Sequence, residues 1–194
     1  MKHVVYTSAP ATYPTPGGSL TDDHFWTEQA LIGSRLDWTI LRNSLYTDLL
    51  LMSLPHAAAT GQLFTATGTA ARNYVTREDC AQTAAAALIK AAGKQILLVN
   101  GPAPVTQAEI AAIVSELTGK TVTHIPVSPD DLRKGLGGAG LPPFLVEALV
   151  AFDIDAARGY HAINAPTVQE LTGRAPTSVR AFLTEHRAAL LAGH

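Results

Sequence analysis

Short apolar runs alternate with longer helix-forming stretches along this sequence. Uninterrupted runs occupy 3–9, 37–41 and 95–99, and such runs are typical of parallel strands covered on both faces. The stretches 22–34 and 80–91 have helical composition and follow candidate caps, namely Ser19 or Thr21 for the first and Asp79 for the second. This alternation predicts an α/β fold built on a parallel sheet.

The remaining elements predict a smaller lobe of helices and short strands. We expect the sheet-bearing half at 1–100 and the lobe segments at 101–194, packed as one compact unit. A helix is expected over 45–58, bent or split by Pro55, and another over 178–191. Further expectations are short strands at 63–66, 73–75 and 122–127, capping boxes at 106–109 and 167–170, a helix start at Ser128-Pro129, a flexible connection over 135–143 and a helix over 144–152.

Composition and charge exclude several classes of protein. Of the 194 residues, 47% are hydrophobic and 15% charged, which excludes a disordered chain and a highly charged coiled coil. Fourteen basic against sixteen acidic residues leave a net charge of −2, so we expect neither nucleic acid nor a membrane as partner. The one cysteine, Cys80, predicts small core packing. We expect neither a membrane-spanning segment nor a signal peptide, since no apolar run is long enough and the first residues lack a signal-peptide core. We expect a soluble cytoplasmic protein.

Five segments of the sequence together form a recognisable pattern. They are HVVYTSA at 3–9, HFWTEQAL at 24–31, LDWTILRNSLY at 36–46, YVTREDCA at 74–81 and LTGRAP at 171–176. This combination resembles the NmrA-like branch of atypical short-chain dehydrogenases, most closely its NAD(P)H-quinone oxidoreductase-type members, and the segment 3–9 fits the fourth sheet strand of that family. The resemblance implies a Rossmann-like sheet, NAD(P)H as cofactor, and a small-molecule substrate, a quinone or an enone.

The sequence lacks the glycine-rich turn with which members of this family bind the cofactor. They begin with a strand and a GxxGxxG turn, whose amides hold the pyrophosphate. Gly17-Gly18 and the glycines of 135–140 do not follow a strand in that way. We therefore expect a truncated Rossmann-like parallel sheet with a smaller C-terminal α/β lobe, and weak binding of dinucleotide. A misplaced start codon, a fragment of a longer protein and a short gene that has lost this chemistry are three explanations. The uncovered sheet edge predicts a homodimer.

Candidate site residues gather where the first two strands end. Ser8 and Ala9 close the first strand, Asn43 and Ser44 the second, and ligands of open α/β sheets bind beyond such ends. Tyr46 follows directly and is a second candidate catalytic residue beside His24. Phe144 is a candidate wall of the cleft, or plain core.

No tyrosine is followed by lysine four residues later, so the proton relay of many short-chain dehydrogenases is absent. The resemblance implies that His24 lies near the nicotinamide, and histidine exchanges protons near neutral pH. The alternative is a surface histidine bonded to Glu28, which lies one helical turn away. We expect Arg42 to form a salt bridge with a carboxylate such as Glu28.

Other chemistries lack their motifs. The histidines are dispersed without HxH or HExxH spacing, which argues against a metal site, and no GxSxG elbow occurs. The leading hypothesis is an NmrA-like NAD(P)H-dependent reductase. Two alternatives remain: a cofactor-independent enzyme of a natural-product pathway that uses His24 in the residual cleft, and a non-catalytic sensor of small molecules or redox state.

Overall fold

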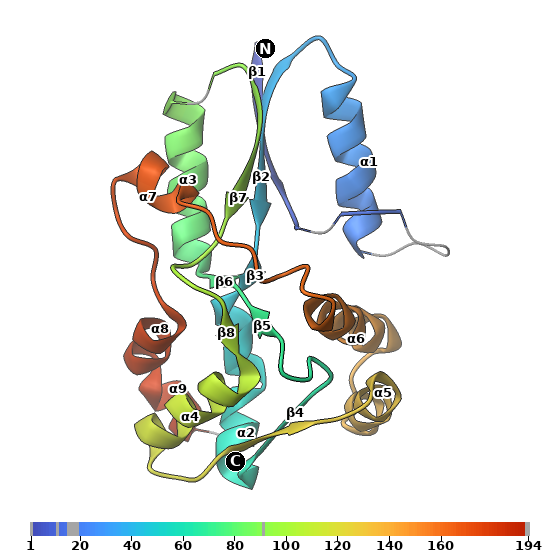
Figure 1. Cartoon of the computed structure of the whole chain (residues 1–194), viewed down its shortest axis with the longest axis vertical. Coiled ribbons are helices and arrows are strands. Elements are labelled where there is room, and N and C mark those ends of the chain that lie inside the picture. Colours follow the sequence, from blue (N-terminus) through green and yellow to red (C-terminus); the bar gives the residue numbers. More distant parts are fainter. Residues whose placement is uncertain (1, 11, 15–19, 91, 193–194) are drawn as a thin grey trace. The chain divides into compact units, whose positions relative to one another are not determined.

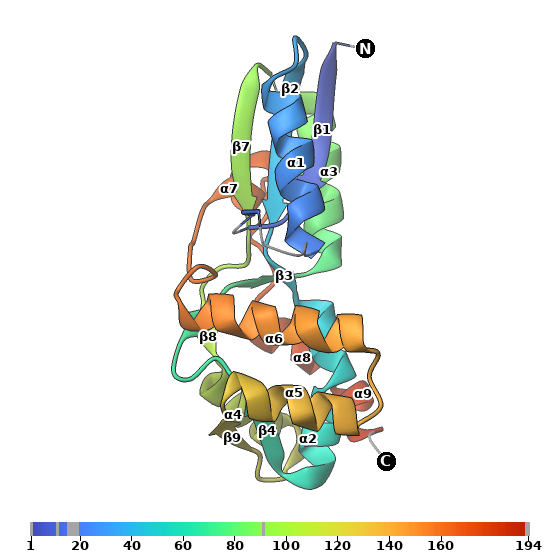
Figure 2. The same ribbon diagram turned by 90° about the vertical axis from the view of Figure 1, so that its right-hand side faces the viewer.

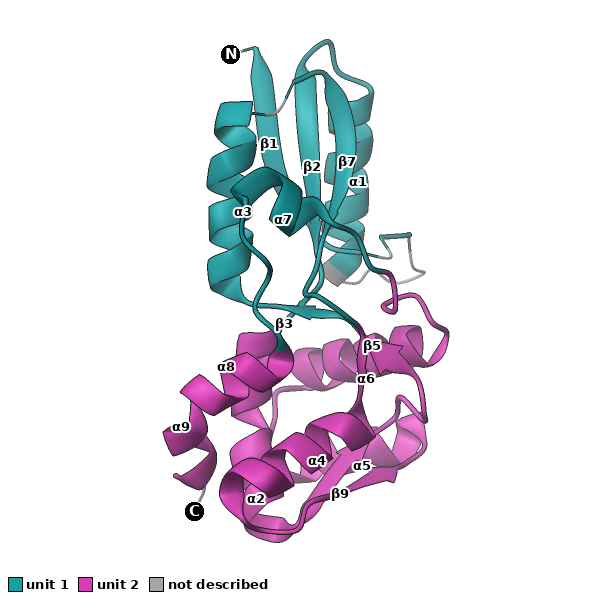
Figure 3. Cartoon of the chain, turned by 60° about the vertical axis from the view of Figure 1, so that its left-hand side comes forward, with its two compact units in different colours: residues 1–46, 73–103, 164–178 teal, residues 47–72, 104–163, 179–194 magenta. Residues whose placement is uncertain are grey.

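The computed structural model describes residues 2–10, 12–14, 20–90 and 92–192. The chain forms two compact units, and each is built from segments that are far apart in the sequence. Unit 1 comprises 1–46, 73–103 and 164–178, and unit 2 comprises 47–72, 104–163 and 179–194 (Figure 3). Residues on both sides of position 100 therefore contribute to each unit.

Unit 1 is built on the predicted parallel sheet, with the strand order β1-β2-β7. The strands are β1 (His3–Ser8), β2 (Asp37–Asn43) and β7 (Lys94–Val99). Ser8 lies beside Arg42, and Asn43 beside Val99, so the carboxyl ends of the strands are level. The central strand β2 is buried from Trp38 to Leu41, as its uninterrupted apolar run predicts.

Helices cover both faces of this sheet. Helix α1 (Leu20–Ile32) lies on one face and α3 (Arg77–Lys90) on the other, where α7 (Thr167–Thr172) packs against α3 (Figures 1 and 2). Two short strands, β3 (Leu45–Tyr46) and β6 (Tyr74–Val75), pair in parallel below the sheet. The core includes Leu41, Val75, Cys80, Val99 and Val168, so the core position predicted for the cysteine is confirmed.

Two predicted helix caps in unit 1 are wrong. Helix α3 begins at Arg77, and the cap is Thr76, whose hydroxyl accepts a hydrogen bond from the Asp79 amide at 3.0 Å. The predicted capping box at 167–170 does not form, because Thr167 already lies inside α7 and Pro166 precedes it without a side-chain cap. The end predicted for α3 at Ala91 and the Ser19 cap lie outside the described residues.

Unit 2 consists of helices around two pairs of short strands. Strands β4 (Gln62–Thr65) and β9 (Thr123–Pro126) pair in parallel, and β5 (Ala71–Arg72) and β8 (Val105–Thr106) antiparallel. The capping box of Thr106 and Glu109 and the serine cap of Ser128 form as predicted. The helices are the 3-10 helix η1 (Thr47–Met52), α2 (Leu54–Thr60), α4 (Gln107–Thr118), α5 (Pro129–Gly138), α6 (Pro143–Ala157), α8 (Val179–Glu185) and α9 (Arg187–Leu191).

Three predicted helix boundaries in this part of the chain are wrong. The helix over 45–58 is split near Pro55, as predicted, since η1 ends at Met52 and α2 begins at Leu54 with Pro55 in its first turn. Its predicted start is wrong, because Leu45 and Tyr46 pair with β6 as strand β3. The connection over 135–143 is largely helical, since α5 continues to Gly138. The last helix is split in two at His186.

Among the helices of the described residues, none combines the length and the apolar character needed to cross a membrane. Within the same ranges, no three His, Cys, Asp or Glu side chains gather in a way that could hold a metal ion.

Candidate functional site

Strand β1 and helix α1 meet through four polar side chains. Tyr6 and Ser8 are two residues apart on a strand and therefore point to the same face of the sheet. His24 and Glu28 are four residues apart on α1 and share a face of the helix. The Tyr6 Oη lies 2.8 Å from His24 Nδ1, and the Ser8 hydroxyl donates to Glu28 Oε1 at 2.6 Å.

Arg42 joins Glu28 and Ser8 from the neighbouring strand. Its Nε donates to Glu28 Oε1 at 3.0 Å and its Nη2 to Oε2 at 2.5 Å, which is the two-pronged geometry that favours arginine over lysine. Glu28 is 0% exposed. The predicted salt bridge between Arg42 and Glu28 is confirmed.

These contacts fix the charge of Glu28. Burial acts to raise the pKa of Glu28, but the hydrogen bonds from Arg42 and Ser8 and the charge of Arg42 together lower it below its ordinary value. The hydrogen bonds that Arg42 donates to Glu28 raise the pKa of Arg42 in turn. Glu28 is therefore a carboxylate at neutral pH, and it holds β1, α1 and β2 together at the carboxyl end of the sheet.

The Tyr6–His24 pair differs from this ion pair in being only half-buried. The tautomer of His24 decides which atom donates across the 2.8 Å contact. The predicted alternative, in which His24 bonds to Glu28, is wrong: His24 bonds to Tyr6, and Glu28 is occupied by Ser8 and Arg42. Sequence reasoning missed Tyr6, although its position two residues before Ser8 on a strand was a usable signal.

The other residues at the strand ends play different parts. Asn43 is 6% exposed, and its side-chain carbonyl oxygen is buried without a hydrogen-bond partner among the described residues. The Ser44 amide donates to the Val99 carbonyl at 2.8 Å and continues the sheet pairing. Ala9 follows β1 and is half-buried.

Two further predicted site residues lie outside this cluster of side chains. The Tyr46 ring packs on the core of unit 1, with the Arg77 guanidinium 5.2 Å from its centre. Phe144 lies in the first turn of α6 in unit 2 and is 70% exposed. Catalysis by Tyr46 and a wall made by Phe144 stay predictions.

The described residues fit one end of a nicotinamide dinucleotide better than the other. A buried Asn43 oxygen without a partner can accept a hydrogen bond from a carboxamide, the group that nicotinamide carries. A pyrophosphate instead needs free amides at a helix N-terminus. At the starts of α3, α4 and α5, the hydroxyls of Thr76, Thr106 and Ser128 each already accept from one such amide. Gly17 and Gly18 lie outside the described residues.

Known proteins resemble the chain in both sequence and structure. It is 32% identical over 188 residues to Quinone oxidoreductase 2 of Escherichia coli, covering 96% of this chain and 65% of that protein. The NADPH complex of the E. coli NADPH-dependent quinone oxidoreductase QOR2 matches with a TM-score of 0.86 at 30% identity, covering 95% of this chain and 65% of that one. Triphenylmethane reductase of Citrobacter sp., complexed with NADP(H), matches with a TM-score of 0.82 at 28% identity, covering 96% and 65%.

A third relative carries the family name. The NmrA-like family domain-containing oxidoreductase flvB of Aspergillus flavus is 29% identical over 208 residues, covering 96% of this chain and 64% of that protein. No family model matches the chain. The chain spans slightly less than two thirds of the length of these relatives. Sequence and fold agree that the chain is similar, over most of its length, to NmrA-like, quinone oxidoreductase-type NAD(P)H oxidoreductases, and that it has an α/β, Rossmann-like parallel sheet.

Proposed function

We propose that this chain carries the proton-donating part of an NAD(P)H-dependent reductase whose substrate is a quinone or an enone. The observation that carries the proposal is the half-buried Tyr6–His24 hydrogen bond, near the end of β1 where open α/β sheets bind their ligands. The E. coli relative is named a quinone oxidoreductase, which supports the same substrate class.

Reduction of a quinone or an enone needs one proton in addition to a hydride. NAD(P)H, when bound, supplies a hydride. The oxygen of a quinone, or the carbonyl side of an enone, then takes one proton to complete the reduction. The Tyr6–His24 pair can hold that proton and release it, and its half-buried position allows water to reload it.

The buried ion pair positions the donor. Glu28 lies one helical turn after His24, and its bonds to Ser8 and Arg42 fix this turn of α1 against β1 and β2. His24 is thereby held at a constant distance from Tyr6. We assign Glu28, Arg42 and Ser8 as positioning residues and His24, with Tyr6, as the proton donor.

The experiment measures NADPH oxidation with the quinone menadione at about millimolar NADPH. We expect His24→Asn to lower kcat about a hundredfold, with a smaller change in KM, because the step that it removes follows binding. Tyr6→Phe keeps the ring but removes the hydroxyl, and we expect a loss of about tenfold.

His3→Asn is the matched control. His3 lies on the same strand, is half-buried and also contacts one hydroxyl, since its Nε2 is 3.0 Å from Thr39 Oγ1. It lies at the opposite end of β1, so its replacement should leave kcat unchanged. A His24→Asn variant that keeps kcat within about twofold overturns the assignment of the donor.

A second function rests on the capped helix starts. Because the hydroxyls of Thr76, Thr106 and Ser128 each occupy one backbone amide at the starts of α3, α4 and α5, we propose that these 194 residues alone bind dinucleotide weakly. Weak dinucleotide binding favours the two alternatives to a reductase. One is a sensor that binds small molecules without turnover, and the other is an enzyme that works without a cofactor. Calorimetric titration with NADPH and NADH decides: a dissociation constant below about 1 mM contradicts weak binding.

A further inference from the structure

Unit 2 contains a cavity that belongs to none of the residues assigned above. Its volume is about 520 Å³, within the range of small-molecule pockets. Helix α2, strand β4 and helix α5 form its walls. The apolar lining consists of Ala57, Leu63, Phe64, Val127, Leu132 and Leu136, with Ala139 at one end.

At Phe64 and Gly135 the cavity is open to a ligand. Phe64 lies on β4 and is 49% exposed, a large fraction for an aromatic residue of a strand, so its ring is available to a ligand. On α5, the residues that face the cavity are Asp131, Leu132, Gly135, Leu136 and Ala139, which follow the spacing of one helical face. A Cβ placed on Gly135 would meet nothing within 4 Å. A side chain at 135 would therefore occupy open space beside the cavity.

The glycine is not required by the backbone. Gly135 lies inside α5 with a helical conformation, where glycine is less stable than almost any other residue. The packing leaves room for a larger residue, and the conformation permits one. Because residue 135 has no side chain, the space beside the cavity stays open. A residue that makes the helix more stable would fill that space.

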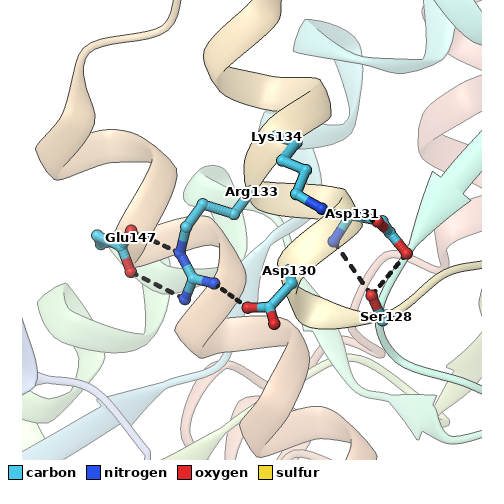
Figure 4. Close-up of polar contacts among 6 residues, drawn as sticks. All are labelled: Ser128, Asp130, Asp131, Arg133, Lys134 and Glu147. Atoms are coloured by element: carbon cyan, nitrogen blue, oxygen red, sulfur yellow. Dashed lines mark hydrogen bonds and ion pairs between the residues drawn. The ribbon is translucent and has the colours of Figure 1, made fainter.

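The charge of the lining selects among ligands. Asp131 is the only acidic residue among the lining residues, and no lysine or arginine is among them. Its Oδ2 accepts from the Ser128 hydroxyl at 2.7 Å, and Lys134 lies 3.6 Å from Oδ1 (Figure 4). Arg133 of α5 forms ion pairs with Asp130 of the same helix and with Glu147 of α6. Ser53, His56 and Gln62 add groups that form hydrogen bonds.

We propose that this cavity binds an aromatic molecule that is neutral or cationic, at a site separate from the Tyr6–His24 pair. The apolar walls and the Phe64 ring bind the aromatic body, and the Asp131 carboxylate favours an amine or a hydroxyl and disfavours an anion. This binding site does not depend on the proposed reductase activity, because its lining residues all lie in unit 2 and the proposed donor residues in unit 1.

The test uses two fluorescent probes with the same aromatic body. N-phenylnaphthylamine is neutral, and anilinonaphthalene sulfonate carries an added negative charge. Titrated into the full chain, the neutral probe should bind at one site and at least about tenfold more tightly than the sulfonate. Asp131→Asn should reduce the ratio of the affinities for the neutral probe and the sulfonate. The serine cap survives in this variant, because the backbone amide of residue 131 still donates to Ser128.

Two glycine variants test the location. Gly135→Leu places a side chain at the cavity and should weaken binding of the neutral probe about tenfold or more. Gly137→Leu is the matched control: it lies in the same helix with open space at its Cβ but does not line the cavity, so binding should stay within about twofold. Thermal melting of both variants verifies folding. Equal affinities of the two variants, or a sulfonate that binds as tightly as the neutral probe, overturn the proposal.

Discussion

Replacing Arg42 by methionine is the most direct test of the buried ion pair. The variant keeps the length of the side chain and removes both bonds to Glu28, leaving a carboxylate that is 0% exposed with Ser8 as its remaining partner. Breaking a fully buried pair costs about 3–5 kcal/mol, and the 28% exposure of the Arg42 side chain places this case at the lower end, near 3 kcal/mol. Glu28→Gln, which keeps a hydrogen-bonding amide, should cost about half as much.

The pKa of Glu28 determines how the stability of the wild type and of the Arg42 variant changes with pH. In the wild type, the pKa of Glu28 is lowered from the ordinary 4.5, so its stabilising contribution is present above that pH and is lost as pH falls. Without Arg42, burial raises the pKa of Glu28, and the folded variant loses stability as pH rises past 4.5. The stability difference between the two proteins should therefore be larger at about pH 7.5 than at about pH 5.

Urea unfolding followed by tryptophan fluorescence measures the effect. Both tryptophans, Trp26 and Trp38, lie in unit 1, so the signal reports the unit that contains the ion pair. Arg35→Met is the control, because Arg35 is exposed and its replacement makes the same change in charge. Removing both charges in Glu28→Leu/Arg42→Met should cost less than Arg42→Met alone. A destabilisation below about 1 kcal/mol, or one that is equal at both pH values, would refute the reasoning.

Three further outcomes are expected. Thr106→Ala removes the hydroxyl that accepts from the Glu109 amide, and should destabilise by about 1 kcal/mol, seen as faster amide hydrogen exchange in α4; unchanged protection contradicts the role of the cap. Gly101→Ala should destabilise by about 2 kcal/mol or more in urea unfolding, because its Cβ would overlap the Tyr74 carbonyl oxygen, whereas Gly137→Ala in α5 should be neutral or stabilising. In the described sheet β1 pairs with β2 alone, so we expect a homodimer through its outer edge; light scattering that finds a stable monomer at micromolar concentration excludes it.

The sequence by itself determined the parallel sheet and several of its boundaries. Burial on both faces requires uninterrupted apolar runs, and these mark β1, β2 and β7 to within about two residues. The caps at Thr106 and Ser128 and the left-handed Gly119 at the end of α4 follow local rules, because each depends on residues within one helical turn. The Arg42–Glu28 pair could also be predicted from the sequence, since a charged residue at a buried strand end needs a partner.

Tertiary contacts decided the rest. Local helix geometry places His24 one turn from Glu28, but the packing of α1 on β1 gives His24 Tyr6 as its partner. The segment 45–58 has helical composition throughout, yet pairing with Tyr74 and Val75 draws Leu45 and Tyr46 into a strand. The cavity is lined by residues from 53 to 139, on elements that no local pattern brings together. Local periodicity fixes which face of an element is apolar, whereas long-range packing chooses what that face contacts.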